Sequence, residues 1–214
     1  DYFPISRISD LQNHFFFLFH HWNDVGSYLG YRGLIKFLQG DEDRFFYPKE
    51  RLTFDEVEFL GSVSRMTGHS VAVTPDKLSK LIFDLPEYQV TINGETPDEY
   101  GNLSYYLSGD ESTQRGFDHY NFLYQKRENL IEFNTGRSEK DNVLFISDSM
   151  SNPIRELIAS HFNKSYFISL EVMYQEDKFF KVEDFLDEHP VDRIVFFLSV
   201  DNLMPDGELQ YFIG

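Results

Sequence analysis

The chain has 214 residues, 41% of them hydrophobic, which is enough to bury a sizeable core within a single domain. Its formal net charge of -17 argues against nucleic acid as a partner, because an acidic surface repels phosphate. Cysteine is absent, which excludes disulfides, thiolate metal sites and cysteine catalysis, and no apolar run reaches the roughly 20 residues that span a bilayer. The sequence begins at Asp1 without a signal peptide, and we expect any membrane anchor to lie in a segment outside this chain.

The first predicted elements are a strand and a helix joined by a polar junction. The aromatic run at 14–19 favours a strand, and apolar residues at helical spacing predict a helix over 24–38 that ends at Gly40. Two histidines, the only tryptophan and an asparagine stand between them at residues 20–23. Polar groups therefore gather beside the N-terminus of this helix.

The middle of the chain is predicted to be rich in strands. Thr53 and Glu56 have the spacing of a capping box, which predicts a helix start there. Further on, residues 88–92 alternate and meet Asn93-Gly94, a strong signal for a hairpin turn, and 122–124 with 130–133 resemble another pair of strands. We therefore expect 76–142 to be a β-rich insertion against the main sheet.

From residue 143 the pattern alternates between strands and helices. Strands are expected at 143–146, 166–170 and 193–198, with helices near 153–162 and 181–188. Such alternation predicts a parallel sheet with right-handed crossovers.

The stretch VLFISDSMSNP at 143–153 is the strongest candidate for a functional site. A buried strand, a polar turn and a helix start place Ser149 at the carboxyl edge of the sheet, where open α/β sheets bind ligands. Its hydroxyl is a candidate nucleophile, with backbone N–H groups nearby to hold an oxyanion. A serine in such a turn is also commonly a plain N-cap.

The histidines at the first junction offer two kinds of chemistry. His21 could act as a base that takes the proton of Ser149, since imidazole suits neutral pH. Alternatively, His20 and His21 could bind a metal, but adjacent residues of a strand point to opposite faces and no further ligands stand at metal spacing. We therefore expect no metal and no cofactor.

The order of these motifs resembles that of the DHHW proteins and the related alginate-acetylation-type SGNH domains. The similarity runs nearly end to end, and it rests on FFFLFHHWNDVGSYLGY at 15–31, FLGS at 59–62, DHYNFL at 118–123 and VLFISDSMSN at 143–152. It implies one α/β domain over 1–214, with an SGNH-hydrolase-like (flavodoxin-like) parallel sheet flanked by helices. It also implies that the Asp/His motif precedes the Ser segment, opposite to ordinary SGNH esterases.

The resemblance implies acyl-ester chemistry, as an O-acetyltransferase or acetylesterase acting on an extracellular or cell-surface polysaccharide of bacteria. Ser149 would be the nucleophile and His21 its base, while Trp22 would buttress that histidine. Asp148 and Asn152 would shape the serine turn, Asn152 would also line the site, and His20 would be a further binding residue. The implied partners are a carbohydrate polymer and a membrane-bound acyltransferase.

Two departures from the family pattern leave an alternative open. The orienting Asp falls at Phe19, which cannot accept a hydrogen bond, and Asp24 or another carboxylate would have to replace it. The usual Asp-x-Arg after the next strand has become Ser169-Leu170-Glu171, which exchanges a positive group for a negative one. The alternative is therefore a catalytically impaired pseudoenzyme that binds glycan or serves as a scaffold.

Overall fold

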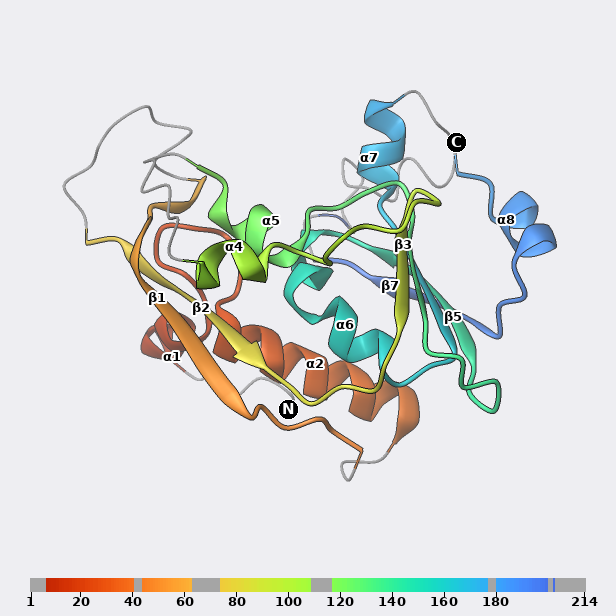
Figure 1. Ribbon diagram of the computed structural model, residues 1–214, viewed down its shortest axis with the longest axis horizontal. Coiled ribbons are helices and arrows are strands. Elements are labelled where there is room, and N and C mark those ends of the chain that lie inside the picture. Colours follow the sequence, from red (N-terminus) through yellow and green to blue (C-terminus); the bar gives the residue numbers. More distant parts are fainter. Residues whose placement is uncertain are drawn as a thin grey trace. The chain divides into compact units, whose positions relative to one another are not determined.

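The computed structural model describes residues 7–40, 44–62, 74–108, 117–176, 180–199 and 202. These residues form a mixed α/β structure (Figure 1). The chain divides into two compact units. The first unit comprises Asp1–Leu85 and Gly101–Gln125, and the second comprises Pro86–Tyr100 and Lys126–Gly214.

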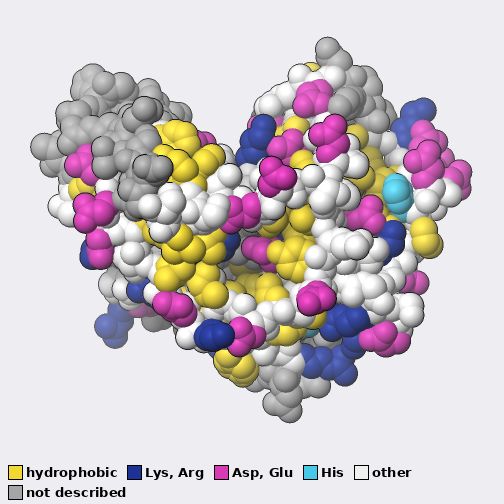
Figure 2. All heavy atoms as spheres, viewed as in Figure 1, with side chains coloured by type: hydrophobic (Ala, Val, Ile, Leu, Met, Phe, Trp, Pro, Cys, Tyr) yellow, Lys and Arg dark blue, Asp and Glu magenta, His cyan; other side chains and the backbone are white. Residues whose placement is uncertain are grey.

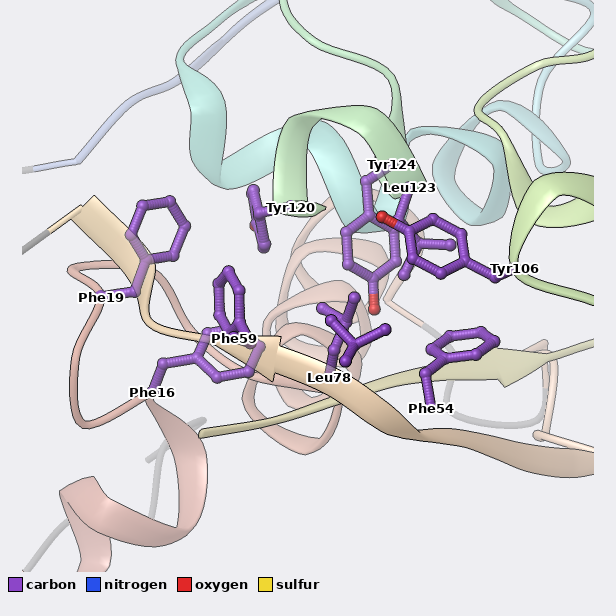
Figure 3. Close-up of a cluster of buried hydrophobic side chains, with 10 residues drawn as sticks. Phe16, Phe19, Phe54, Phe59, Leu78, Tyr106, Tyr120, Leu123 and Tyr124 are labelled. Carbon is purple, nitrogen blue, oxygen red and sulfur yellow. The ribbon is translucent and has the colours of Figure 1, made fainter. Parts of the chain in front are cut away.

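The first unit packs helices with a two-stranded antiparallel sheet. Its elements are α1 (Ile8–His14), α2 (Asp24–Gln39), β1 (Glu50–Phe59), β2 (Asp76–Ile82), α4 (Leu103–Leu107) and α5 (His119–Tyr124). β1 pairs with β2 in an antiparallel register in which Phe54 faces Leu78. The core between these elements is largely aromatic, and its buried members are Phe16, Phe19, Phe54, Val57, Phe59, Leu78, Tyr106, Tyr120, Leu123 and Tyr124 (Figure 3).

The second unit contains a five-stranded sheet with the order β3-β4-β6-β5-β7. Its elements are β3 (Gln89–Ile92), β4 (Ile131–Asn134), β5 (Asn142–Ser147), the 3₁₀ helix η1 (Ser149–Ile154), α6 (Arg155–Ala159), β6 (Lys164–Ile168), α7 (Leu170–Gln175), α8 (Val182–Glu188) and β7 (Arg193–Phe197). Residues 143–146 of β5 are all fully buried, as expected for a strand covered on both faces.

The α/β pattern after residue 143 is confirmed. All three predicted strands form, both helices form close to their predicted positions, and β5 runs parallel to β6 and to β7. The strands after residue 143 form the predicted parallel part of the sheet, and β4 and β3 from the region 76–142 extend it antiparallel, so that the sheet as a whole is mixed. The SGNH-specific details of the fold stay a prediction.

Three local predictions are wrong. Residues 15–19 form no strand, because α1 ends at His14 and the chain then turns in a loop whose rings pack in several directions. Residues 122–124 belong to α5, whose N-cap Asp118 accepts a hydrogen bond from the backbone N–H of Asn121 at 3.3 Å. The Thr53 capping pattern starts no helix, because residues 50–59 pair with β2 as a strand.

The predicted insertion 76–142 contributes to both units. Its β2, α4 and α5 belong to the first unit, whereas β3 and β4 belong to the second. The Asn93-Gly94 turn is present, with positive φ angles of 51° and 86°. Whether the chain is a single domain with an insertion stays a prediction.

On the face shown in Figure 2, the acidic side chains of the described residues are dispersed rather than in one block. Within the described parts of the chain, no helix is long and apolar enough to cross a membrane.

Candidate functional site

Ser149 stands where the connections of the central parallel strand diverge. After β5 the chain crosses to β6 on one side and later returns to β7 on the other side. The carboxyl end of β5 is therefore a topological switch point, the usual ligand-binding place of an open α/β sheet. Ser149 is the first residue of η1 and is half-buried, so its hydroxyl lies at the edge of the sheet rather than in the core.

Asp148 fixes the turn that carries Ser149. Its carboxylate is 1% exposed and accepts a hydrogen bond from the backbone N–H of Met150 at 2.9 Å. It also accepts from the backbone N–H of Ser199 at 2.6 Å and from the side-chain amide of Asn202 at 2.9 Å. A carboxylate with three donors is held firmly, so Asp148 ties the serine turn to the segment after β7.

A buried arginine organises the residues that follow Ser149. Arg155 is 2% exposed, and it donates to Ser151 Oγ at 3.1 Å and to Asn152 Oδ1 at 2.5 Å. Its remaining nitrogen donates to the backbone carbonyl of Lys126 at 3.2 Å. Asn152, a predicted site residue, is thus buried with its carbonyl oxygen directed to Arg155.

Arg155 also influences a neighbouring tyrosine. Burial raises the pKa of Tyr100 to about 12, and the positive charge of Arg155 opposes this rise. The sequence analysis missed Arg155. Its spacing of three and four residues from Asn152 and Ser151 was the available signal, since such residues share one helix face.

The carboxyl end of β6 carries an ion pair at the position of the altered family motif. Ser169 caps α7, and its hydroxyl accepts from the backbone N–H of Val172 at 3.4 Å. Glu171 pairs with Arg127 and accepts from the side-chain amide of Gln175 at 3.0 Å. The negative charge that the sequence places here is therefore accompanied by a positive one.

His21 lies in the first unit, on a loop between α1 and α2. The loop is closed by a single antiparallel bridge between Phe15 and Trp22 and by a hydrogen bond from the Phe16 N–H to the His21 carbonyl at 3.1 Å. Asn23 then caps α2 by accepting from two backbone N–H groups, each at 3.0 Å. The predicted junction of strand and helix is in fact a junction of loop and helix.

Aromatic rings surround the His21 imidazole, which is 2% exposed. Tyr120 stacks on it with ring centroids 4.5 Å apart and planes 3° from parallel. Phe19 meets it edge-on, also at 4.5 Å, and is itself part of the aromatic core in Figure 3. The residue at the position of the family's Asp therefore packs against the imidazole through its ring.

Several contacts hold the loop of His21 in place. The Asp76 carboxylate accepts from the backbone N–H groups of Phe17 at 3.1 Å and Leu18 at 2.7 Å. Gly61 has a φ of 58°, and an added Cβ would lie 2.3 Å from the Leu18 carbonyl oxygen. Asp76 is another residue that the sequence analysis missed, because its partners are 58 and 59 residues away.

The other predicted residues of this unit have distinct surroundings. His20 is exposed, with Nδ1 3.3 Å from Ser62 Oγ and its ring centroid 4.2 Å from that of His21. The expectation that the two imidazoles point apart is wrong, because they stand on a loop rather than on a strand. No group of three or more His, Asp or Glu residues that could hold a metal ion occurs within the described ranges.

Trp22 and Asp24 both make contacts that stabilise the fold of the first unit. An added Cβ at Gly30 would lie 2.3 Å from the Trp22 ring, so the indole packs directly on α2. Both carboxylate oxygens of Asp24 accept from Arg51, at 2.6 Å and 3.0 Å. The buried carboxylate of Asp24 therefore forms an ion pair that joins α2 to the half-exposed Arg51 of β1.

The two halves of the predicted site belong to different units. Ser149, Asp148 and Asn152 lie in the second unit, whereas His21, His20 and Trp22 lie in the first. Because the structure determines each unit by itself, the pairing of Ser149 with His21 stays a prediction.

No protein family model matches the sequence, and no curated protein matches it in sequence. The solved structures do provide a match. A DHHW family protein from Eubacterium siraeum superposes with a TM-score of 0.69 at 13% identity, covering 94% of this chain and 63% of that one. The fold resembles that of a DHHW family protein.

Two structures of Bacillus cereus PatB1 are similar as well. PatB1 with a sulfonyl adduct gives a TM-score of 0.66 at 17% identity, and PatB1 alone gives 0.65 at 16%, each covering 92% of this chain. The chain spans about two thirds of the length of these relatives, between 63% and 66%. At such identities the likeness concerns the fold alone.

Proposed function

We propose that this protein is an O-acetyltransferase-like serine enzyme that modifies a polysaccharide. The observation that carries the proposal is the position of Ser149, a half-buried residue that starts a short helix at the switch point of a DHHW-like sheet. The sulfonyl adduct named for PatB1 supports it, because sulfonyl reagents are electrophiles that an activated hydroxyl typically attacks at sulfur. We further propose that the protein acts outside the cytoplasm, beside a membrane-bound acyltransferase that supplies the acyl group.

In this mechanism the hydroxyl oxygen of Ser149 attacks the carbonyl carbon of an acyl ester. The His21 imidazole takes the serine proton and passes it to the departing alcohol, which leaves an acyl-serine. A sugar hydroxyl then attacks the acyl-serine, gives its proton to the imidazole, and leaves as the new ester while serine regains its proton. Water in place of the sugar would give hydrolysis, and the better-held acceptor decides between the two.

Labelling of Ser149 tests this proposal. A fluorophosphonate or sulfonyl fluoride probe should modify Ser149, as found by mass spectrometry of the peptide, and p-nitrophenyl acetate should be hydrolysed above background. Ser149→Ala and His21→Ala should lose both activities. Ser138→Ala is the matched control, because Ser138 is an exposed serine in a turn of the same unit. An unmodified Ser149 together with background hydrolysis would refute the proposal.

A second candidate is a glycan-binding or scaffold protein without turnover, and the observation that favours it is Phe19. In serine proteases, removing the charge of the orienting Asp lowers kcat by about 10⁴. In subtilisin, however, loss of the Asp costs less than loss of the Ser or the His. Glycan binding that is unchanged in Ser149→Ala, with no labelling in the unaltered protein, would support this candidate. Turnover that vanishes in the same variant would exclude it.

A further inference from the structure

The second unit contains a pocket of about 300 Å³ that the proposed reaction does not use. It lies between the segment that begins β3 and the segment that follows β4. The lining residues are Glu87, Tyr88, Gln89, Asn134, Thr135 and Gly136.

This pocket is at the opposite end of the sheet from Ser149. Asn134 pairs with Lys164, the first residue of β6, and β6 runs parallel to β5. Ser149 lies just beyond the last residue of β5, so the six residues of β5 separate the two places. At 3.3 Å per residue this is about 20 Å. In Figure 1 the loop after β4 accordingly lies at the other end of the sheet from α7, which follows β6.

The lining is polar and carries no cation. Two side-chain amides and a carboxylate supply both donors and acceptors, and Tyr88 adds an aromatic wall. This combination suits a sugar, whose hydroxyls donate and accept while its C–H groups pack on a ring. Glu87 disfavours an anionic ligand, and the polar lining disfavours an apolar one.

The walls of the pocket are fixed by contacts behind the lining. Thr135 Oγ1 donates to the backbone carbonyl of Phe162 at 2.6 Å, and the Tyr88 hydroxyl donates to Glu156 of α6. Such contacts hold the polar groups in position before a ligand arrives, which lowers the entropic cost of binding.

We propose that this pocket binds a neutral sugar unit of the polysaccharide, remote from the reaction centre. The inference rests on the proposed function, since a long acceptor chain can contact the protein well beyond the hydroxyl that is acylated. β3 is an edge strand, which could also accept an extended peptide. The lining offers no apolar pockets for alternate side chains of a peptide, and the sugar fits its chemistry better.

The test titrates the full chain with two neutral tetrasaccharides, chitotetraose and maltotetraose, and with the anionic tetragalacturonate, while amide signals are followed by NMR. At least one neutral sugar should shift the signals of Gln89 and Gly136, and the anionic one should not. Gln89→Ala should weaken binding about fivefold, the effect of one hydrogen bond. Ser138→Ala, two residues from Gly136 but outside the lining, should bind as the unaltered protein does.

Unmoved signals with both neutral sugars would overturn the inference, and so would equal affinity in Gln89→Ala. Stronger shifts with tetragalacturonate would also overturn it. Binding is measured without turnover, so its outcome is separate from that of the Ser149 labelling. Sugar binding at the pocket without labelling of Ser149 would support this inference and count against the proposed reaction.

Discussion

Replacing Asp148 by asparagine should destabilise the second unit and slow the chemistry of Ser149. The carboxylate accepts three hydrogen bonds, from Met150, Ser199 and Asn202, at 2.9, 2.6 and 2.9 Å. An asparagine keeps one acceptor oxygen and turns an NH₂ group toward the remaining donors. Hydrogen bonds to a buried charge contribute about 1.5–3 kcal/mol each, so we expect Asp148→Asn to lower the free energy of unfolding by about 3 kcal/mol.

The assay is urea unfolding followed by circular dichroism, together with the rate of fluorophosphonate labelling at Ser149. For a chain of this size, 3 kcal/mol corresponds to a fall in Tm of about 6–12 °C. The matched control is Asp141→Asn, whose carboxylate pairs with Arg193 at 2.7 Å while their side chains are 40% and 48% exposed. Such a surface pair is worth about 0–1 kcal/mol. If the two variants lost the same stability, the anchoring role of Asp148 would be refuted.

Two further predictions concern the rest of the candidate site. Asp76→Asn removes one of the two carboxylate oxygens that hold the His21 loop, so hydrogen exchange of the Phe17 and Leu18 amides should accelerate about tenfold or more. The control Asp55→Asn, which breaks an exposed ion pair with Lys77, should leave this exchange unchanged. Unchanged exchange in Asp76→Asn would contradict this. Tyr100, with its pKa raised to about 12, should keep its proton while an unfolded chain loses it near pH 10, so stability should fall as the pH rises from 10 to 12. A titration of tyrosinate absorbance in the folded protein checks this, and ionisation of every tyrosine together near pH 10 would speak against it.

The sequence was informative where one pattern dominated the local structure. The apolar run 143–146 is buried on both faces, and the polar turn with Pro153 after it allows few structures other than strand, turn and helix. The helix from Asp24 was equally well marked, by apolar residues at helical spacing and by Gly40 at its end, where φ is 71°.

The sequence patterns gave wrong predictions where aromatic side chains pack against segments that are distant in the chain. The run at 15–19 looks like a strand by composition, but its rings meet Phe59 and Tyr120, which come from distant segments. Likewise, β3 finds its partner β4 about 40 residues later, so no local signal could establish the antiparallel half of the sheet. The partners of Asp76, which are 58 and 59 residues away, depend on the same long-range folding.

In a Ser-His-Asp triad the Asp carboxylate has two roles, and Phe19, which stands at the corresponding position in this chain, can supply only one of them. The Asp holds the imidazole in one orientation, and its charge stabilises the imidazolium that forms during the reaction. In this chain the stacked Tyr120 and the edge-on Phe19 fix the plane of the His21 ring, which supplies orientation through packing. A phenyl ring cannot replace the charge of a carboxylate at that position. We therefore expect the proposed reaction through Ser149 and His21 to proceed more slowly than in a full triad, so that sensitive labelling is a better first measurement than turnover.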